Sequence, residues 1–200
     1  MILFVAVVLC LLVGLARGGN WRGLLSVHLR YGWLLVVAFA AQLPVIYHPA
    51  VTGESPPSPS QHAIFLASHA LIMALAWINR RVKGVRWITL GLSLNLAVLL
   101  ANGGWMPVTP EAITGAGQLA LVPSLVSGTR VTSSKSIILG KEHTKLWYLS
   151  DLLVLGKPFP VPSIFSPGDV VIALGACALI QKSLSSPDLR LPIEEQRSRQ

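Results

Sequence analysis

The chain has 200 residues, of which 52% are hydrophobic and only 12% are charged, and its formal net charge is +8. Soluble domains carry about 25% charged residues, so this composition argues against a water-soluble domain and predicts an integral membrane protein. The basic residues lie beside apolar runs and are not interleaved with aromatic residues, which predicts contact with membrane lipids and excludes nucleic acid as a partner.

Four apolar runs occupy the first half of the chain, and a fifth, from Val170 to Ile180, follows a long polar stretch. A helix that crosses a bilayer core needs about 17–25 mostly apolar residues. We therefore predict an all-α membrane protein with about five transmembrane helices in a single domain, residues 1–182. The expected spans are 2–16, 31–47, 63–78, 85–101 and 168–182, with a long outer loop at 102–167 and a disordered cytoplasmic tail at 183–200.

The basic residues predict the orientation of these spans. Arg17 and Arg22 follow the first run and none precedes it, the reverse of a cleavable secretory signal. Lys and Arg in short loops mark the cytoplasmic side, so we expect the N-terminus and the long loop outside and the C-terminus inside. The Pro- and Ser-rich residues 53–60 predict an exposed outer turn. The residues that carry this argument are Arg17, Arg22, Arg30, Arg80, Arg81, Lys83, Arg86, Lys182, Arg190, Arg197 and Arg199.

Small residues recur at helical spacing in the third and fourth spans, and helices in lipid associate through such residues. They predict two packing faces: Ala63, Ala67, Ala70 and Ala74, and then Gly91, Asn95, Ala97 and Ala101. Cys10 and Cys177 both lie inside apolar runs, so we expect small buried thiols without a disulfide or zinc site. No metal or cofactor is predicted.

His69 is a candidate functional residue, because ionisable groups inside a bilayer are costly. The structural alternative is a neutral imidazole bonded to a neighbouring helix, at Asn95 or Ser93. Gln42 with Pro44 predicts a kink or a polar link in the second span. The spans contain no Asp, Glu, Lys or Arg near their centres, which argues against an ion-coupled transporter.

The long loop opens with Asn102, Gly103, Gly104 and Trp105. These residues predict either a rigid turn with Trp105 anchored at the membrane interface, or a polar binding site formed by Asn102 and the glycine amides. Residues 111–126 are predicted to lie on the membrane or to enter it as a re-entrant segment. Residues 128–145 are expected to be solvated, including His143 beside Glu142, a pair too small for a metal site.

The apolar run 146–155 is too short to span and predicts an interfacial or re-entrant helix that carries Asp151. Burial would raise the pKa of Asp151, as in a general acid, but a helix cap or a pairing with Lys145 explains the residue equally well. Four prolines over 158–167 predict an extended strap. Ser166, Pro167 and Asp169 have the pattern of a capping box at the start of the last span.

The sequence Asn102-Gly103-Gly104-Trp105-Met106-Pro107, the stretch through Leu149-Ser150-Asp151, and Phe165-Ser166-Pro167-Gly168-Asp169 resemble a family of uncharacterised bacterial multi-pass membrane proteins, a domain of unknown function. The resemblance covers nearly the whole chain. It implies a location in the bacterial plasma membrane and supplies no activity and no catalytic residues.

Three functions remain open, and whether the protein is an enzyme is undecided. The first is a structural or accessory protein, such as a subunit of a membrane complex. The second is an enzyme or binder of a lipid-linked substrate with a site at the outer interface, for which Asn102, His143 and Asp151 would converge. The third is a small-solute transporter, for which Gln42, His69 and Asn95 would face one continuous cavity.

Overall fold

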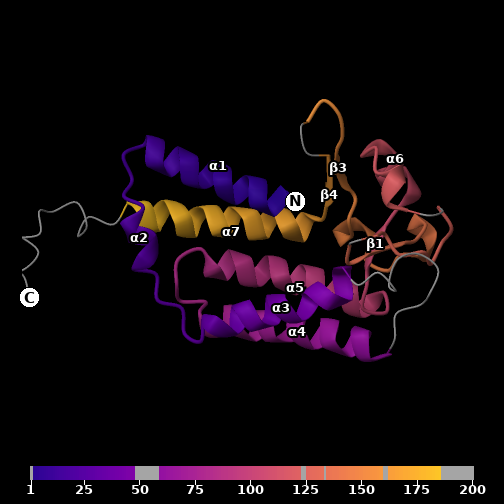
Figure 1. Ribbon diagram of the computed structural model, residues 1–200, viewed down its shortest axis with the longest axis horizontal. Helices are drawn as coiled ribbons and strands as arrows, with labels where there is room; N and C mark the ends of the chain where they lie inside the picture. Colours follow the sequence, from indigo (N-terminus) through magenta and orange to yellow (C-terminus); the bar gives the residue numbers. More distant parts are fainter. Residues whose placement is uncertain (1, 48–58, 123–124, 133, 160–161, 186–200) are drawn as a thin grey trace, which may run out of the picture.

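The computed structural model describes residues 2–47, 59–122, 125–132, 134–159 and 162–185. Five long helices lie side by side, and a cap of short helices and strands covers one end of them (Figure 1). The mostly helical fold is therefore confirmed, and each apolar run is a helix. The long helices are α1 (Ile2–Ala16), α3 (Trp33–Tyr47), α4 (Pro59–Ile78), α5 (Val85–Ala101) and α7 (Pro167–Leu184), and the short α2 (Arg22–Leu25) follows α1.

Two of the described helices are long and apolar enough to cross a membrane: α4 with 20 residues and α7 with 18. The helices α1 and α3 have 15 residues each and α5 has 17, and all three are apolar. Apolar helices of this length also occur in the cores of soluble proteins. Length and composition thus identify two candidate membrane spans. The predicted five transmembrane helices are not established by the fold. Residues 53–58 of the predicted turn and 186–200 of the predicted tail lie outside the described residues. Pro59 and Ser60 begin α4, and Ser183 and Leu184 end α7, so these four residues are helical and the predicted turn and tail were too long.

Glycine residues bring α5 and α7 into close contact. A Cβ atom added to Gly175 would lie 2.7 Å from the carbonyl oxygen of Gly84 and 2.7 Å from the backbone nitrogen of Ile88. About two turns further along the pair, a Cβ atom on Gly91 would lie 2.5 Å from the carbonyl oxygen of Gly168. Only glycine allows two helix backbones to approach so closely. The predicted packing role of Gly91 is confirmed.

The alanine stripe of α4 does not pack inside the bundle, contrary to the prediction. Ala63, Ala67, Ala70 and Ala74 are exposed, and so is Ala97 of α5. The buried face of α4 is formed instead by larger side chains, among them Phe65, Ile72 and Leu75. These side chains fill more of the space between helices and remove more apolar surface from the exterior, so they determine which face turns inward.

Polar side chains link the helices, with partners other than those predicted. Gln42 Nε2 of α3 lies 3.3 Å from His69 Nδ1 of α4. The His69 Nδ1 atom also lies 3.0 Å from the carbonyl oxygen of Phe65. The predicted polar link at Gln42 is confirmed. Asn95 and Ser93 were the wrong partners for His69, because Asn95 Nδ2 donates to Asp169 and the Ser93 hydroxyl donates to the carbonyl oxygen of Thr89.

Cys10 of α1 and Cys177 of α7 form a disulfide, so the expectation of free thiols was wrong. The two helices run in the same direction, and Gln181 Nε2 donates to the carbonyl oxygen of Cys10 at 2.6 Å. The two cysteines are separated by 167 residues. An apolar run reveals which residues prefer burial, but it does not reveal which helix will lie beside it.

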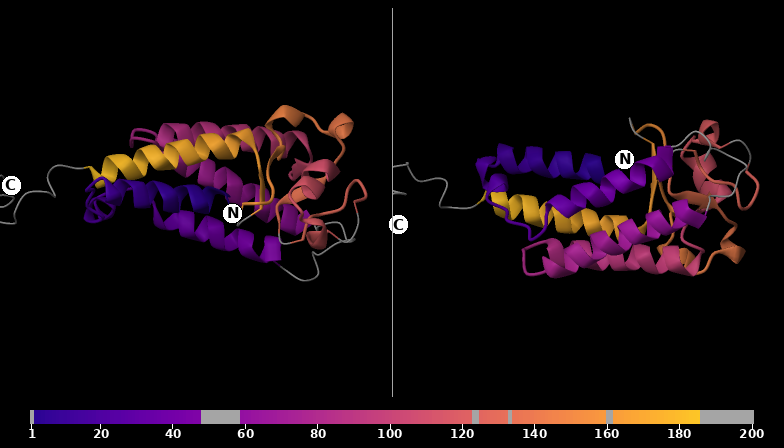
Figure 2. Two further views of the ribbon diagram at one scale, coloured as in Figure 1. Left: turned by 90° about the horizontal axis from the view of Figure 1, so that it is seen from above. Right: turned by 60° about the horizontal axis from the view of Figure 1, so that its bottom comes forward.

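The cap contains two small sheets, seen from two further directions in Figure 2. Strand β1 (Met106–Val108) pairs in parallel with β2 (Ser136–Ile138), and β3 (Leu153–Leu155) pairs antiparallel with β4 (Ser163–Phe165). The helix α6 (Pro110–Gly115) follows β1. Three single turns of 3-10 helix complete the cap: η2 (Leu119–Leu121), η3 (Lys141–His143) and η4 (Trp147–Leu149).

The helix predicted over 146–155 is absent from this described segment, which consists of η4, Ser150, Asp151 and then β3. A short apolar run does not distinguish a helix from a strand, and here pairing with β4 decides for the strand. The extended strap is confirmed where it forms β4. Residues 110–121 contain only the short α6 and η2, so the long loop is a compact cap and not a long re-entrant helix.

Trp105 fastens the cap to the bundle. Its ring is 5% exposed, stacks on Phe65 of α4 with ring centres 5.2 Å apart, and has the guanidinium of Arg130 4.0 Å from its centre. Phe65, Val98 and Trp105 belong to one buried apolar cluster. The rigid turn predicted here is confirmed, but Trp105 packs in the core and does not lie at an exposed interface.

Candidate ligand site

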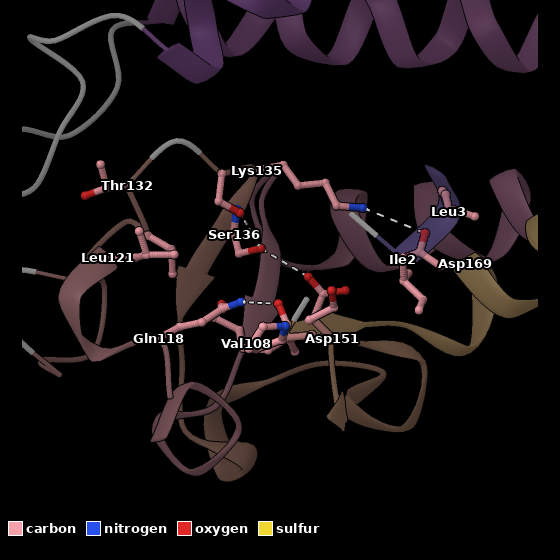
Figure 3. Close-up of a pocket in the computed structure, with 15 residues that line it drawn as sticks. Ile2, Leu3, Val108, Gln118, Leu121, Thr132, Lys135, Ser136, Asp151 and Asp169 are labelled. Carbon is pink, nitrogen blue, oxygen red and sulfur yellow. Dashed lines mark hydrogen bonds and ion pairs between the residues drawn. The ribbon is translucent and has the colours of Figure 1, made fainter. Parts of the chain in front are cut away.

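Two cavities lie on either side of the junction between the cap and the bundle. The first, the cap cavity, has a volume of about 350 Å³ and lies between the cap strands and the first residues of α1 and α7 (Figure 3). Its described lining includes the polar side chains of Lys135, Ser136, Asp151 and Asp169. It is therefore a polar chamber at the end of an apolar bundle.

The second cavity, the bundle cavity, has a volume of about 370 Å³ and lies among α1, α3, α4, α5 and α7. Its lining is mostly aliphatic and includes Leu35, Leu92 and Ile172. Leu3, Lys135 and Asp169 line both cavities. The polar chamber and the apolar one therefore meet at these three residues.

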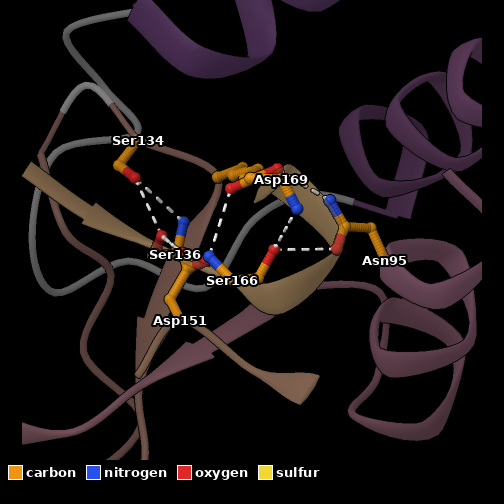
Figure 4. Close-up of polar contacts among 7 residues, drawn as sticks. Asn95, Ser134, Ser136, Asp151, Ser166 and Asp169 are labelled. Carbon is orange, nitrogen blue, oxygen red and sulfur yellow. Dashed lines mark hydrogen bonds and ion pairs between the residues drawn. The ribbon is translucent and has the colours of Figure 1, made fainter. Parts of the chain in front are cut away.

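Asp169 occupies this junction because it caps α7. Ser166 Oγ accepts a hydrogen bond from the Asp169 backbone nitrogen at 3.0 Å, and Asp169 Oδ2 accepts one from the Ser166 backbone nitrogen at 3.2 Å. This is the predicted capping box. Asp169 Oδ1 also accepts from Asn95 Nδ2 at 2.8 Å, and Ser166 Oγ donates to Asn95 Oδ1 at 2.9 Å (Figure 4). The start of α7 is thus fixed to α5 by a closed polar network.

Asp151 enters the cap cavity from the segment between η4 and β3. Its backbone nitrogen donates to the carbonyl oxygen of Pro107, and its Oδ2 accepts a hydrogen bond from Ser136 Oγ at 3.1 Å. The side chain is 4% exposed, and Oδ1 has no hydrogen-bond partner in the described structure. Burial raises the pKa of Asp151 to about 6, and the nearby positive charge of Lys135 opposes that rise.

Lys135 lines the same cavity as the two carboxylates and pairs with one of them. Its ammonium nitrogen is 4.0 Å from Asp169 Oδ1, and its side chain is 30% exposed. The two serines beside Lys135 form a hydrogen-bonded chain that ends at Asp151. Ser134 Oγ donates to Ser136 Oγ at 3.0 Å, and Ser136 Oγ donates to Asp151 Oδ2. The described charges of the cavity are therefore two acids and one base.

The predicted site residues do not converge. Asp151 lines the cap cavity, whereas the exposed His143 is not part of its described lining and has Nδ1 3.1 Å from Oε1 of its neighbour Glu142. Asn102 bonds to the backbone of Lys145 in both directions, at 2.8 and 2.9 Å, and so braces the end of α5. His69 lines the bundle cavity.

The glycines beside Asn102 serve the turn that follows α5. Gly103 and Gly104 have φ angles of +71° and +85°, which explains why glycine is needed there. A Cβ atom on Gly104 would also collide with the ring of His62. Neither glycine is part of the described lining of the two cavities.

Lys135 and Ser136 were not predicted from the sequence, and for Asp169 a helix cap was favoured over a catalytic role. The available signal was weak, because Lys135 lies in a Ser-rich segment that is typical of a solvated loop. Within the described ranges, no group of three or more His, Cys, Asp or Glu residues could hold a metal ion. The arrangement suits recognition of a ligand with a polar end and an apolar end.

The fold and the site define an apolar helical bundle with a cap of short helices and strands and a cavity between the two. Residues 26–181 match a family of unknown function, DUF5317, and the chain belongs to this family. The predicted membership of a domain of unknown function is confirmed, and the membrane location and bacterial source stay predictions. No curated protein and no solved structure matches the chain.

The raised pKa of Asp151 predicts a pH-dependent stability. The folded state binds this proton more tightly than the unfolded state, so stability from this group is complete below pH 3.8 and is lost as the pH rises to about 6. We expect Asp151→Asn to gain about 3 kcal/mol in free energy of unfolding relative to wild type across this interval. Denaturation of both proteins in detergent, followed by tryptophan fluorescence, measures the difference. A difference in free energy of unfolding between the two proteins that does not change with pH would contradict a buried, ionised Asp151.

Proposed function

We propose that the protein is an integral membrane protein with five spans, with the cap on the outer side and the C-terminus in the cytoplasm. Large apolar side chains on the outside of the bundle support this proposal, for example Val36 at 70%, Leu100 at 62% and Leu174 at 61% exposure. A water-facing surface would not favour so many exposed aliphatic groups, whereas lipid solvates them. The short helices are accommodated by local thinning of the bilayer.

The distribution of basic and aromatic residues supports the same orientation. Three segments meet at the end of the bundle opposite the cap: those after α1 and α4, and the end of α7. Asn79 Nδ2 donates to the carbonyl oxygen of Arg30, and the backbone nitrogen of Asn20 donates to the carbonyl oxygen of Leu184. These segments carry the basic residues that the positive-inside rule assigns to the cytoplasm. Tryptophans exposed in or beside these segments suit an interfacial belt: Trp21, Trp33, Trp77 and Trp87.

We infer further that the protein binds an amphiphilic, lipid-type molecule at the outer interface, as an enzyme or as a carrier of that molecule. The observation that carries this proposal is the junction of a polar and an aliphatic cavity at Leu3, Lys135 and Asp169. A polar head fits the cap cavity and a hydrocarbon chain fits the bundle cavity. Membrane lipids are therefore the proposed partners.

The test is to purify the protein in mild detergent and to identify retained lipid by native mass spectrometry. We expect one tightly held lipid per protein in wild type. Ala76→Phe, which fills the bundle cavity, should lose it, whereas Ala74→Phe on the exposed face of α4 should keep it. If Ala76→Phe does not fold, Leu92→Phe serves the same purpose, since Leu92 also lines the cavity. Equal retention by wild type and both cavity variants would contradict the proposal.

Transport of a small solute is a second candidate, because Gln42, His69 and Asn95 all line the bundle cavity. These side chains are hydrogen-bonded to one another or to Asp169, and the remaining lining is mostly aliphatic, which favours a hydrocarbon occupant over a hydrated path. A role as an accessory subunit is supported by the exposed alanine stripe of α4, since such stripes suit contact with another helix. Copurification of a stoichiometric protein without lipid would favour this last role.

A further inference from the structure

The cap cavity contains an unused hydrogen-bond acceptor. Asp151 is 4% exposed and lines the cavity, and its Oδ1 finds no donor among the residues that the structure describes. Its Oδ2 already accepts from Ser136 Oγ. A buried carboxylate oxygen without a donor is costly, so a ligand that supplies a donor here gains binding free energy. The cavity therefore favours a head that donates hydrogen bonds.

The charges of the cavity also determine which charge the ligand group at Asp151 should carry. Asp169 is satisfied by Asn95, by the backbone of Ser166 and by Lys135, whereas Asp151 has a hydroxyl donor at one oxygen only. With both acids ionised, two negative charges face one ammonium. The charge lacking at Asp151 is positive, and an ammonium group both donates and neutralises.

Lys135 defines a second requirement, for an anion. Lys135 lines both cavities, so its ammonium lies at the point where the polar head of a bound lipid would join the hydrocarbon chains. At 4.0 Å from Asp169 Oδ1 its ammonium forms an ion pair but is beyond hydrogen-bond distance, so its N–H donors can bond to a further acceptor. Lys135 and Asp151 both line the cap cavity (Figure 3). A phosphate at the junction would therefore accept from Lys135 while the rest of the head reached toward Asp151.

We propose that the head held in the cap cavity is the phosphoethanolamine group of a phospholipid, with its phosphate at Lys135 and its ammonium at Asp151. The order of groups along this head, from chain to phosphate to ammonium, is the order in which the bundle cavity, Lys135 and Asp151 follow one another. A phosphocholine head has no N–H to donate, and a phosphoglycerol head has no positive charge. This inference rests on the lipid binding proposed above and specifies its head.

The test titrates delipidated protein in detergent with dioctanoyl lipids and follows tryptophan fluorescence at neutral pH. Phosphatidylethanolamine should bind about ten- to a hundredfold more tightly than phosphatidylcholine or phosphatidylglycerol, in keeping with one charge-assisted hydrogen bond. Asp151→Asn should remove this preference, because it removes the charged acceptor to which only the ethanolamine head can donate. Lys135→Gln should weaken all three lipids by a similar factor. Glu111→Gln, an exposed acid of the cap, is the matched control and should bind like wild type.

The outcomes separate this inference from the function on which it rests. Equal affinity of wild type for the three lipids, or a preference that survives in Asp151→Asn, would overturn the head assignment while lipid binding stands. Absence of binding by any lipid would overturn both. Free O-phosphoethanolamine is a further arm: binding as tight as that of the lipid would support the head chemistry and overturn the role of the bundle cavity.

Discussion

Gly175→Ala should destabilise the protein by about 1–3 kcal/mol, because the new methyl group would collide with rigid backbone of α5. The nearest atoms, the carbonyl oxygen of Gly84 and the nitrogen of Ile88, both lie at 2.7 Å and neither can rotate away. α5 and α7 would have to move apart, which would also stretch the bond from Asn95 to Asp169. Gly175→Val adds two further methyl groups and should abolish folding. Thermal unfolding in detergent measures the loss.

Gly115→Ala is the matched control for this substitution. A methyl group on Gly115 would meet only Val154 Cγ1, at 3.6 Å, which is an ordinary contact distance. Its melting temperature should equal or exceed that of wild type, since alanine favours the helix α6. If Gly175→Ala melted together with Gly115→Ala, the two helix backbones would not lie as close as described.

Asp169→Ala is expected to cost about 2–4 kcal/mol in free energy of unfolding. The substitution removes the acceptor for the Ser166 backbone nitrogen and for Asn95 Nδ2, and both Ser166 and Asn95 are buried. A lost cap costs about 1 kcal/mol, and a buried donor left without a partner costs about 1–3 kcal/mol. Denaturant titration monitored by tryptophan fluorescence checks the value.

Two further variants identify the cause of that loss. Glu111→Ala removes an acid from the first turn of α6, where the side chain is exposed, and should change stability by less than about 0.5 kcal/mol. Asn95→Ala combined with Asp169→Ala should cost less than the sum of the single variants, because the two residues share one network. Full additivity would contradict the coupling between α5 and α7.

The helices of this protein could be predicted from sequence because long apolar runs are distinctive, and all five runs are helical. Which face of each helix is buried could not be predicted from sequence. The alanines of α4 have helical spacing, but so does the set Phe65, Ile72 and Leu75 on another face, and larger side chains decide which face is buried. The disulfide between Cys10 and Cys177 was missed because a helix does not encode its neighbour in its own composition.

The site was predicted in part. Asp151 stood out as an acid in an apolar run, and it does line the cap cavity. His143 and Asn102 stood out for their chemistry, yet one is exposed and the other serves the backbone of Lys145. Lys135 and Ser136 became visible only through the pairing of β2 with β1, which carries a polar loop to the start of α7. Such long-range pairing has no local signal in the sequence.

The position of α1 bears on how the protein is assembled during synthesis. This helix leads the chain, yet it lies beside α7, and its residues Ile2 and Leu3 form part of the wall of the cap cavity. Every other long helix and the whole cap are made between the two partners. The wall of the cap cavity that Ile2 and Leu3 form with Asp169 of α7 can therefore be completed only after α7 has been synthesised.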